Sequence, residues 1–381
     1  MSWQKVSLES ISTKIGDGLH GTPKYDDSGE FYFINGNNLS DGKILIKEDT
    51  KRISSIEYDK IKKELNDKTV LVAINGTIGN IGLYRDELVA LGKSACYINT
   101  NEKAEKLFVR YVLANQDFQI YARDFATGST IKNLGLKAIR DYNFNLPPLP
   151  TQRKIASILS AYDDLIENNL KRIKLLEEKA FASYKLIVKS EKLEKVKLSE
   201  VAVLNEESLK ANSNLDKLLY VDIASVSTGS IDNKTEYELK EAPGRAKRVL
   251  KHKDIIWSCV RPNRKSYSFV WRPEDNLIAS TGFVVITAKT IPATFLYQLV
   301  TANEFVNYLE NHAKGATYPA VTASDFDEAT IQIASNSVMK EYNEETNQCF
   351  EFKHILQKQN TKLREARDIL LPKLMSGQIE V

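Results

Sequence analysis

A short strip of the chain, residues 244–272, concentrates basic side chains. It holds nine Lys or Arg residues against one acid, Asp254, a local charge of +8 in 29 residues. Three large aromatics, Trp257, Tyr267 and Trp271, are interleaved with them. Because Arg and Lys beside planar rings and Asn suit phosphates and base edges, the strip is predicted to bind nucleic acid. The plainer alternative is a solvated basic face. The candidates from this strip are Arg245, Lys247, Arg248, Arg261, Asn263, Arg264, Lys265 and Tyr267.

A second group of candidates is mostly polar rather than basic. Asn and Thr side chains can hydrogen-bond base edges, but in turns they often serve only the local backbone. The sequence leaves both interpretations open. The candidates are Lys24, Tyr25, Asn35, Asn37, Asn75, Thr77, Ser129, Thr130, Lys132 and Asn133 in the first half, and Lys314, Thr317 and Tyr318 in the second.

Signatures of catalysis are missing from the chain. There is no phosphate-binding loop with Lys-Ser/Thr, no GxGxxG that opens a helix, no HExxH and no GxSxG. The four histidines and three cysteines stand apart, without the spacing of metal ligands or of a disulfide framework. We therefore predict a non-catalytic chain with no catalytic residues, no metal and no cofactor of its own.

The chain repeats itself at about half its length. Ala114 and Ala302, in similar Ala-Asn contexts, are 188 residues apart, and Phe118 and Phe305 are 187 apart. Gly128 aligns with Gly315 at the same offset of 187. The common order of these matches predicts a duplicated unit of one domain followed by one helix, related by a pseudo-two-fold axis.

The helical part of each repeat shows a heptad pattern. Residues 151–189 contain no Gly or Pro, and Thr151 is a candidate N-cap after a proline-rich run. The second helix should end at Pro372. Neither helix can bury its row of apolar residues alone, so the two helices are predicted to pair as an antiparallel coiled coil. Asn169 and Gln359 either set its register or face water. The predicted pairing residues are Leu159, Tyr162, Ile166, Asn169, Ile173, Leu176, Phe352, Leu356, Gln359, Leu363 and Leu370.

The other part of each repeat is predicted to mix helices and strands. Apolar runs at 31–34, 70–74 and 282–286 are typical of strands, and Asn-Gly turns separate them. One helix is expected in each repeat, at 107–118 and at 295–306. The fold class is therefore α+β, with domains at 1–148 and 191–336 and helices at 149–190 and 337–381.

Composition limits the class of protein. The chain has 381 residues, 42% of them hydrophobic, and a net charge of +3. This is enough apolar material for a core, and it argues against a uniformly basic coat protein. There is no apolar run long enough to span a membrane and no signal peptide, so a cytoplasmic protein is expected.

Several of these motifs together resemble the specificity subunit (HsdS) of Type I restriction–modification systems. The matching stretches are Gly-Ser-Thr at 128–130 followed by 131–134, the strand and paired prolines at 144–149, Gln-Arg-Lys-Ile-Ala at 152–156, and the ending at 367–377. The second half departs from the family pattern at 318–321 and 338–342.

The resemblance implies a division of labour between subunits. The two domains would be target recognition domains, each reading one half of a bipartite site on double-stranded DNA. The helices would act as spacer and as docking surface for two modification (methyltransferase) subunits, with restriction (motor and nuclease) subunits in the same complex. S-adenosylmethionine and ATP would be bound by those partners and not by this chain.

Other functions remain open from the sequence. One is a coiled-coil scaffold that does not read DNA, and another is the specificity subunit of a methylation-only system. A fused nuclease–methyltransferase is disfavoured by the absence of a nucleotide-cofactor loop.

Overall fold

The computed structural model describes residues 3–128, 132–210 and 213–381 and divides the chain into two compact units. The first unit is Met1–Glu167 with Asn360–Val381, and the second is Asn168–Gln359. Each long helix therefore contributes one end to each unit. In the part of the chain that the structure describes, no helix has the length and apolar character needed to cross a membrane.

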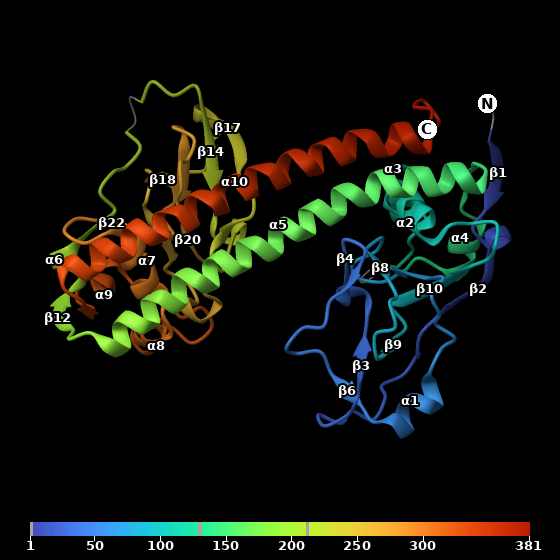
Figure 1. Cartoon of the computed structure of the whole chain (residues 1–381), viewed down its shortest axis with the longest axis horizontal. Coiled ribbons are helices and arrows are strands. Elements are labelled where there is room, and N and C mark those ends of the chain that lie inside the picture. The colour runs from blue at the N-terminus through green and yellow to red at the C-terminus, as the bar shows by residue number, and fades with distance from the viewer. Residues whose placement is uncertain (1–2, 129–131, 211–212) are drawn as a thin grey trace. The chain divides into compact units, whose positions relative to one another are not determined.

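The first unit combines small sheets with short helices (Figure 1, blue to green). Its strands are β1 (Gln4–Ser7), β2 (Ser12–Asp17), β3 (Phe31–Ile34), β4 (Leu39–Ser40), β5 (Lys43–Ile44), β6 (Arg52–Ile53), β7 (Thr69–Ala73), β8 (Ile81–Leu83), β9 (Val89–Leu91), β10 (Ala95–Thr100) and β11 (Asn143–Leu146). Its helices before the long one are η1 (Glu9–Ile11), η2 (Gly36–Asn38), α1 (Ser55–Ile61), α2 (Lys106–Ala114), α3 (Gln116–Asp124) and α4 (Leu136–Asp141).

The second unit has the elements that follow the first long helix. Its strands are β12 (Glu194–Lys197), β13 (Ala202–Leu204), β14 (Lys217–Val221), β15 (Val226–Ser227), β16 (Ser230–Ile231), β17 (Thr235–Glu238), β18 (Ala246–Val249), β19 (Ile255–Ser258), β20 (Tyr267–Phe269), β21 (Leu277–Ser280), β22 (Phe283–Ala288) and β23 (Thr330–Ile333). Its helices are α6 (Leu198–Val201), η3 (Ile223–Ser225), η4 (Leu239–Glu241), η5 (Pro262–Arg264), α7 (Ala293–Thr301), α8 (Asn303–His312) and α9 (Ala323–Asp327).

The two units share one strand order. The main sheet is β2-β10-β7-β8 in the first unit and β13-β22-β19-β20 in the second. Another sheet in each unit contains a parallel pair, β3 with β9 or β14 with β21, and β1-β11 corresponds to β12-β23. The mixed helix-and-strand class is confirmed, and the second unit adds β18 beside β21. The same topology in both units is what a duplicated sequence would produce.

The helix expected in each unit is in fact two. Asn115 separates α2 from α3, and Ala302 separates α7 from α8; both have extended backbone angles. The Asn115 side chain accepts a hydrogen bond from the Gln116 N–H and so caps α3. The apolar spacing continues across the break, which is why the sequence alone suggests one helix.

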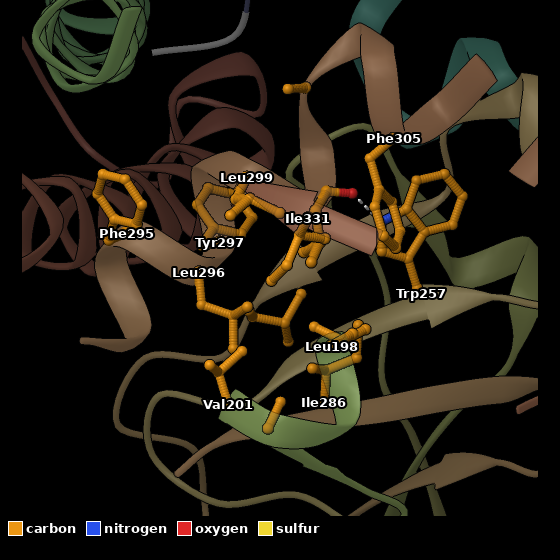
Figure 2. Packing of buried hydrophobic residues seen from close by; sticks show 14 of the residues in the cluster. Leu198, Val201, Trp257, Ile286, Phe295, Leu296, Tyr297, Leu299, Phe305 and Ile331 are labelled. Atoms are coloured by element: carbon orange, nitrogen blue, oxygen red, sulfur yellow. Dashed lines mark hydrogen bonds between the residues drawn. The ribbon is translucent and has the colours of Figure 1, made fainter. Parts of the chain in front are cut away.

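The core of the second unit lies between its main sheet and α7. Trp257 on β19 is fully buried, and its indole N–H donates to the Val300 carbonyl at 2.9 Å, the dashed line in Figure 2. Phe295, Leu296 and Leu299 pack in the same cluster. A buried Trp needs such a partner for its N–H, so β19 and α7 are held in one arrangement.

The long helices are α5 (Leu149–Ser190) and α10 (Asn336–Met375). In the second unit Tyr342 donates to the Ala180 carbonyl and Lys353 to Glu177, and in the first Arg367 donates to Asp163, so the helices are antiparallel within each unit (Figure 1).

The predicted bounds 149–190 match α5, but the predicted N-cap Thr151 and the predicted end of the second helix at Pro372 are each wrong by a few residues. The helix α5 begins at Leu149, before Thr151, with Pro150 in its first turn, where a missing N–H costs little. The helix α10 continues through Pro372 to Met375.

The predicted helix faces are right on α5 and partly wrong on α10. Leu159, Ile166, Asn169 and Ile173 are buried and Tyr162 and Leu176 half-buried. On α10 Leu356 is buried and Leu363 and Leu370 half-buried, but Phe352 is 53% exposed and Gln359 is exposed. The buried row instead contains Thr346, Lys353 and Asn360, seven residues apart. Asn169 donates to Gln359 at 3.4 Å, so Gln359 contacts the partner helix from its edge.

Replacing Leu356 by Ala is expected to lower the free energy of unfolding by about 2–5 kcal/mol, because Leu356 is buried between the helices. Replacing Phe352, which is exposed, should change it by less than about 1 kcal/mol. Denaturant unfolding of the two variants measures the difference. Equal losses would mean that Phe352 belongs to the helix contact after all.

Candidate nucleic-acid interface

In the second unit two loops far apart in sequence are joined. The loop between β19 and β20 pairs with the segment after α8 through bridges of Ala320 with Val260 and with Lys314. The Arg261 N–H donates to the Pro319 carbonyl at 2.7 Å. Predicted candidates from two separate stretches of sequence therefore lie on one surface.

The Arg261 side chain connects the two segments of this surface. Its guanidinium lies 4.3 Å from the centre of the Tyr318 ring and donates to the Thr317 carbonyl at 3.2 Å. Both Arg261 and Lys265 have left-handed backbone angles, with φ of 52° and 53°. Such angles cost free energy in non-glycine residues and tend to occur at functional sites.

Between these two residues, the short helix η5 leaves Asn263 and Arg264 exposed. Exposed Arg and Asn side chains on a rigid turn can contact phosphates and base edges. Thr317 and Lys314 are also exposed, and Tyr318 is 65% exposed. We call the surface formed by 260–265 and 314–320 the loop pair of the second unit.

The strand β18 adds basic residues close to this loop pair. The Thr281 N–H donates to the Arg245 carbonyl, and the Cys259 N–H donates to the neighbouring Gly282 carbonyl. Burial raises the pKa of the Cys259 thiol to about 11, and the positive charge of Arg248 opposes that rise. The Arg248 Nε is buried without a hydrogen-bond partner among the described residues. Arg245 and Lys247 are exposed.

Several other residues of the basic strip form ion pairs or hydrogen bonds with neighbouring side chains. Lys251 pairs with Glu207 at 2.8 Å and Arg272 with Glu351 of α10 at 3.1 Å. Lys265 donates to the Asn303 side chain at 3.1 Å. Tyr267 is only 8% exposed and packs against Trp257 in the core, so its prediction as a surface candidate does not fit the structure.

The first unit has an equivalent loop pair. The turn between β7 and β8 meets the segment after α3 through bridges of Asn133 with Asn75 and with Thr127, and the Leu134 N–H donates to the Ile74 carbonyl at 2.8 Å. Thr77 and Lys132 are exposed and Asn75 is half-buried. The candidates Ser129 and Thr130 lie outside the described residues. We call 75–80, 127–128 and 132–133 the loop pair of the first unit.

A hollow beside this loop pair contains residues that the sequence interpretation missed. It is lined by Asn75 and Asn133, and also by Asp17, His20 and Lys93. The His20 ring lies 2.6 Å from the Asp17 carboxylate. The Gly92-Lys93-Ser94 turn between two strand patterns was the only sequence signal for Lys93, and His20 had none.

The remaining candidates of the first unit lie outside the loop pair. Asn35 accepts a hydrogen bond from Ser94, and its N–H is bound by Asn38, so it serves the local backbone. The Asn37 carbonyl accepts from Lys47. Tyr25 packs edge-on against Phe33 and bridges to Ile53, next to the exposed Lys24.

No group of three His, Cys, Asp or Glu side chains that could hold a metal ion occurs within 3–128, 132–210 and 213–381. The polar side chains of the two loop pairs are mainly those of Arg, Lys, Asn, Thr and Tyr, which can bind anions and the hydrogen-bonding edges of bases.

Several known proteins are similar to this chain in sequence or in fold. The Type I restriction modification DNA specificity domain matches residues 1–178. The HindI specificity subunit of a Type I restriction enzyme of Haemophilus influenzae is 30% identical over 139 residues, 34% of this chain and only 30% of that subunit. The MjaIX specificity subunit of Methanocaldococcus jannaschii is 23% identical over 82% of this chain and 78% of that subunit.

Among solved structures, the Type-I restriction-modification system S subunit from M. genitalium has a TM-score of 0.60 at 19% identity, covering 98% of this chain and 96% of that one. At this identity the likeness concerns the fold, and it extends over both units. Together with the relatives above, it confirms the family resemblance found in the motifs. Residues 1–178 match the Type I restriction modification DNA specificity domain, and over most of its length the chain is similar to a Type I restriction specificity subunit.

Proposed function

We propose that this chain is the DNA-reading subunit of a Type I restriction–modification complex and binds a bipartite site on double-stranded DNA, one unit per half-site. The observation that supports this best is the pair of equivalent loop pairs. In the first unit the turn after β7 bridges to the segment after α3, and in the second unit the turn after β19 bridges to the segment after α8. A protein with two similar reading surfaces suits a site with two half-sites.

The two loop pairs differ in chemistry. The second unit offers Arg261 and Arg264, with Arg245 just before β18, which suit phosphates and guanine edges. The first unit offers Asn75, Thr77 and Asn133, which suit hydrogen bonding to bases with less charge. The two half-sites should therefore depend unequally on salt.

The chemical steps belong to partners in this proposal. This chain would be non-catalytic and act in the cytoplasm, while two modification subunits bind S-adenosylmethionine and restriction subunits use ATP. The long helices carry apolar side chains on their outer surfaces: Leu175 and Leu186 in the second unit are 63% and 65% exposed, and Leu165 and Ile369 in the first are 52% and 58% exposed. Large exposed apolar side chains on helices favour docking of a protein partner.

The proposal is tested by selection from a library of random double-stranded DNA. The full chain, co-expressed and purified with its cognate modification subunits, is mixed with the library, and the bound duplexes are sequenced. Two short motifs separated by a constant number of base pairs are expected. If the bound pool is no different from the input, or if no modification subunit co-purifies, the proposed role is wrong.

A further inference from the structure

In the first unit a glycine turn is attached to the long helices through buried charges. Arg110 on α2 donates to the Asp163 carboxylate of α5 and, at 3.2 Å, to the Asp41 carbonyl. The next residue, Gly42, has a φ of 77°, and a Cβ there would lie 2.3 Å from the Arg110 Nε. The turn between β4 and β5 thus approaches Arg110 as closely as glycine allows.

Asp163 joins this turn to both helices. It also accepts hydrogen bonds from the Tyr111 hydroxyl and from Arg367 of α10, both at 2.6 Å. The Arg110 side chain is only 9% exposed. Burial alone would raise the pKa of Asp163, but the charge of Arg110 and the hydrogen bonds from Tyr111, Arg110 and Arg367 outweigh it, and the pKa is lowered. The carboxylate is therefore charged and satisfied on both oxygens. We call Asp41, Arg110, Tyr111, Asp163 and Arg367 the first turn anchor.

The second unit has its own version with different residues. Lys353 of α10 is 7% exposed and donates to Glu177 of α5 at 2.6 Å and to the Gly229 carbonyl at 3.0 Å. Gly229 lies in the turn between β15 and β16, with a φ of 77° as in Gly42. We call Glu177, Lys353 and Gly229 the second turn anchor. The same place in the fold is fixed by a buried charge in both units, although the residues are not alike.

We propose that these turn anchors are specificity determinants for the spacing between the half-sites, with Asp163 and Lys353 as positioning residues that hold each recognition domain at one angle to the helices. This rests on the proposed reading of a bipartite site. Buried ion pairs add little net stability compared with apolar packing, but they are satisfied in one geometry only. Apolar contacts also join each domain to the helices, but they leave no charge unpaired when the angle changes, whereas the turn anchors do.

The geometry of DNA explains why such an angle matters. One added base pair moves the second half-site by about 3.4 Å and turns it by about 35°. A domain that could turn by that amount would accept several spacings. A domain held by a buried carboxylate with three hydrogen-bond donors would accept a single spacing.

The test compares the wild type with Asp163→Asn, which keeps the shape but removes the charge, and with Lys353→Met. The full chain with its modification subunits selects from random double-stranded DNA, and the half-site motifs and the distribution of spacings are read from the bound pool. We expect both motifs to be kept in each variant, with the preference for the wild-type spacing lowered about tenfold, the size of a typical coupling between interacting residues.

Two further variants control for lost folding. Tyr111→Phe removes one hydrogen bond to Asp163 and leaves the charges, so it should broaden the spacings less. Glu178→Gln removes an acid from the exposed Lys174–Glu178 pair of α5 and should change nothing. Unchanged spacings in Asp163→Asn, Tyr111→Phe and Lys353→Met, with a wild type that selects one spacing, would overturn the inference. A wild type that selects no bipartite motif would instead overturn the proposed function.

Discussion

Replacing Arg245, Arg248, Arg261 and Arg264 together by Gln is expected to lower the affinity for the selected duplex by about 10³-fold at physiological salt. Each lost phosphate contact reduces the slope of log affinity against log salt by about 0.9, so the slope should fall by about 3–4. Arg261 and Arg264 belong to the loop pair of the second unit, Arg248 lies on β18 and Arg245 just before it; Arg245 and Arg264 are exposed. Fluorescence anisotropy with a labelled duplex from about 50 to 200 mM salt measures both quantities.

A matched control separates this local effect from loss of charge in general. Lys217, Lys234, Lys240 and Lys251 are surface residues of the same unit, and three of them are paired with Glu residues. Their replacement by Gln removes the same charge and should lower the slope by less than about 1. Because Arg261 also supports the loop, Arg264→Gln alone should still lose about 10-fold. An unchanged slope in the four-Arg variant would remove the strip from the DNA surface.

The basic strip shows how far charge along a sequence predicts a surface. Its charge density predicts a binding surface, but side chains that are neighbours in sequence point to different parts of the structure. Arg272 pairs with Glu351 of α10, and Tyr267 is buried on the edge strand β20. The joining of Arg261 with Tyr318 depends on a bridge between segments more than 50 residues apart, which no local pattern contains.

The long helices show a different limit. The heptad pattern predicted that both long helices exist, and on α5 the residues that it placed on the inner face are buried or half-buried. On α10 an apolar criterion chose Phe352 over its neighbour Lys353, yet Lys353 is buried because Glu177 and the Gly229 carbonyl satisfy its charge. A buried polar residue can be recognised only from its partners, and the partners of Lys353 lie 176 and 124 residues away in sequence.

Removing seven residues from each long helix, 168–174 and 355–361, is expected to lower the affinity for the wild-type site by about 100-fold or more, since one half-site's share of the specific contacts is lost. These segments oppose each other, because Asn169 contacts Gln359 and Glu177 contacts Lys353. Seven residues keep the heptad pattern and shorten each helix by about 10.5 Å, close to three base pairs. Both turn anchors remain, so each domain keeps its support.

The selected spacing should therefore become about three base pairs shorter, with both half-site motifs unchanged. Three base pairs also turn the second half-site by about 100°, whereas two helical turns rotate a domain by only about 20°, so the shorter site should be bound more weakly than the wild-type site. Removing 168–174 alone is the control: it places Glu177 and Lys353 out of register, and thermal unfolding should occur at a lower temperature. If the doubly shortened chain folds, binds and still selects the wild-type spacing, the helices do not set the distance between the half-sites.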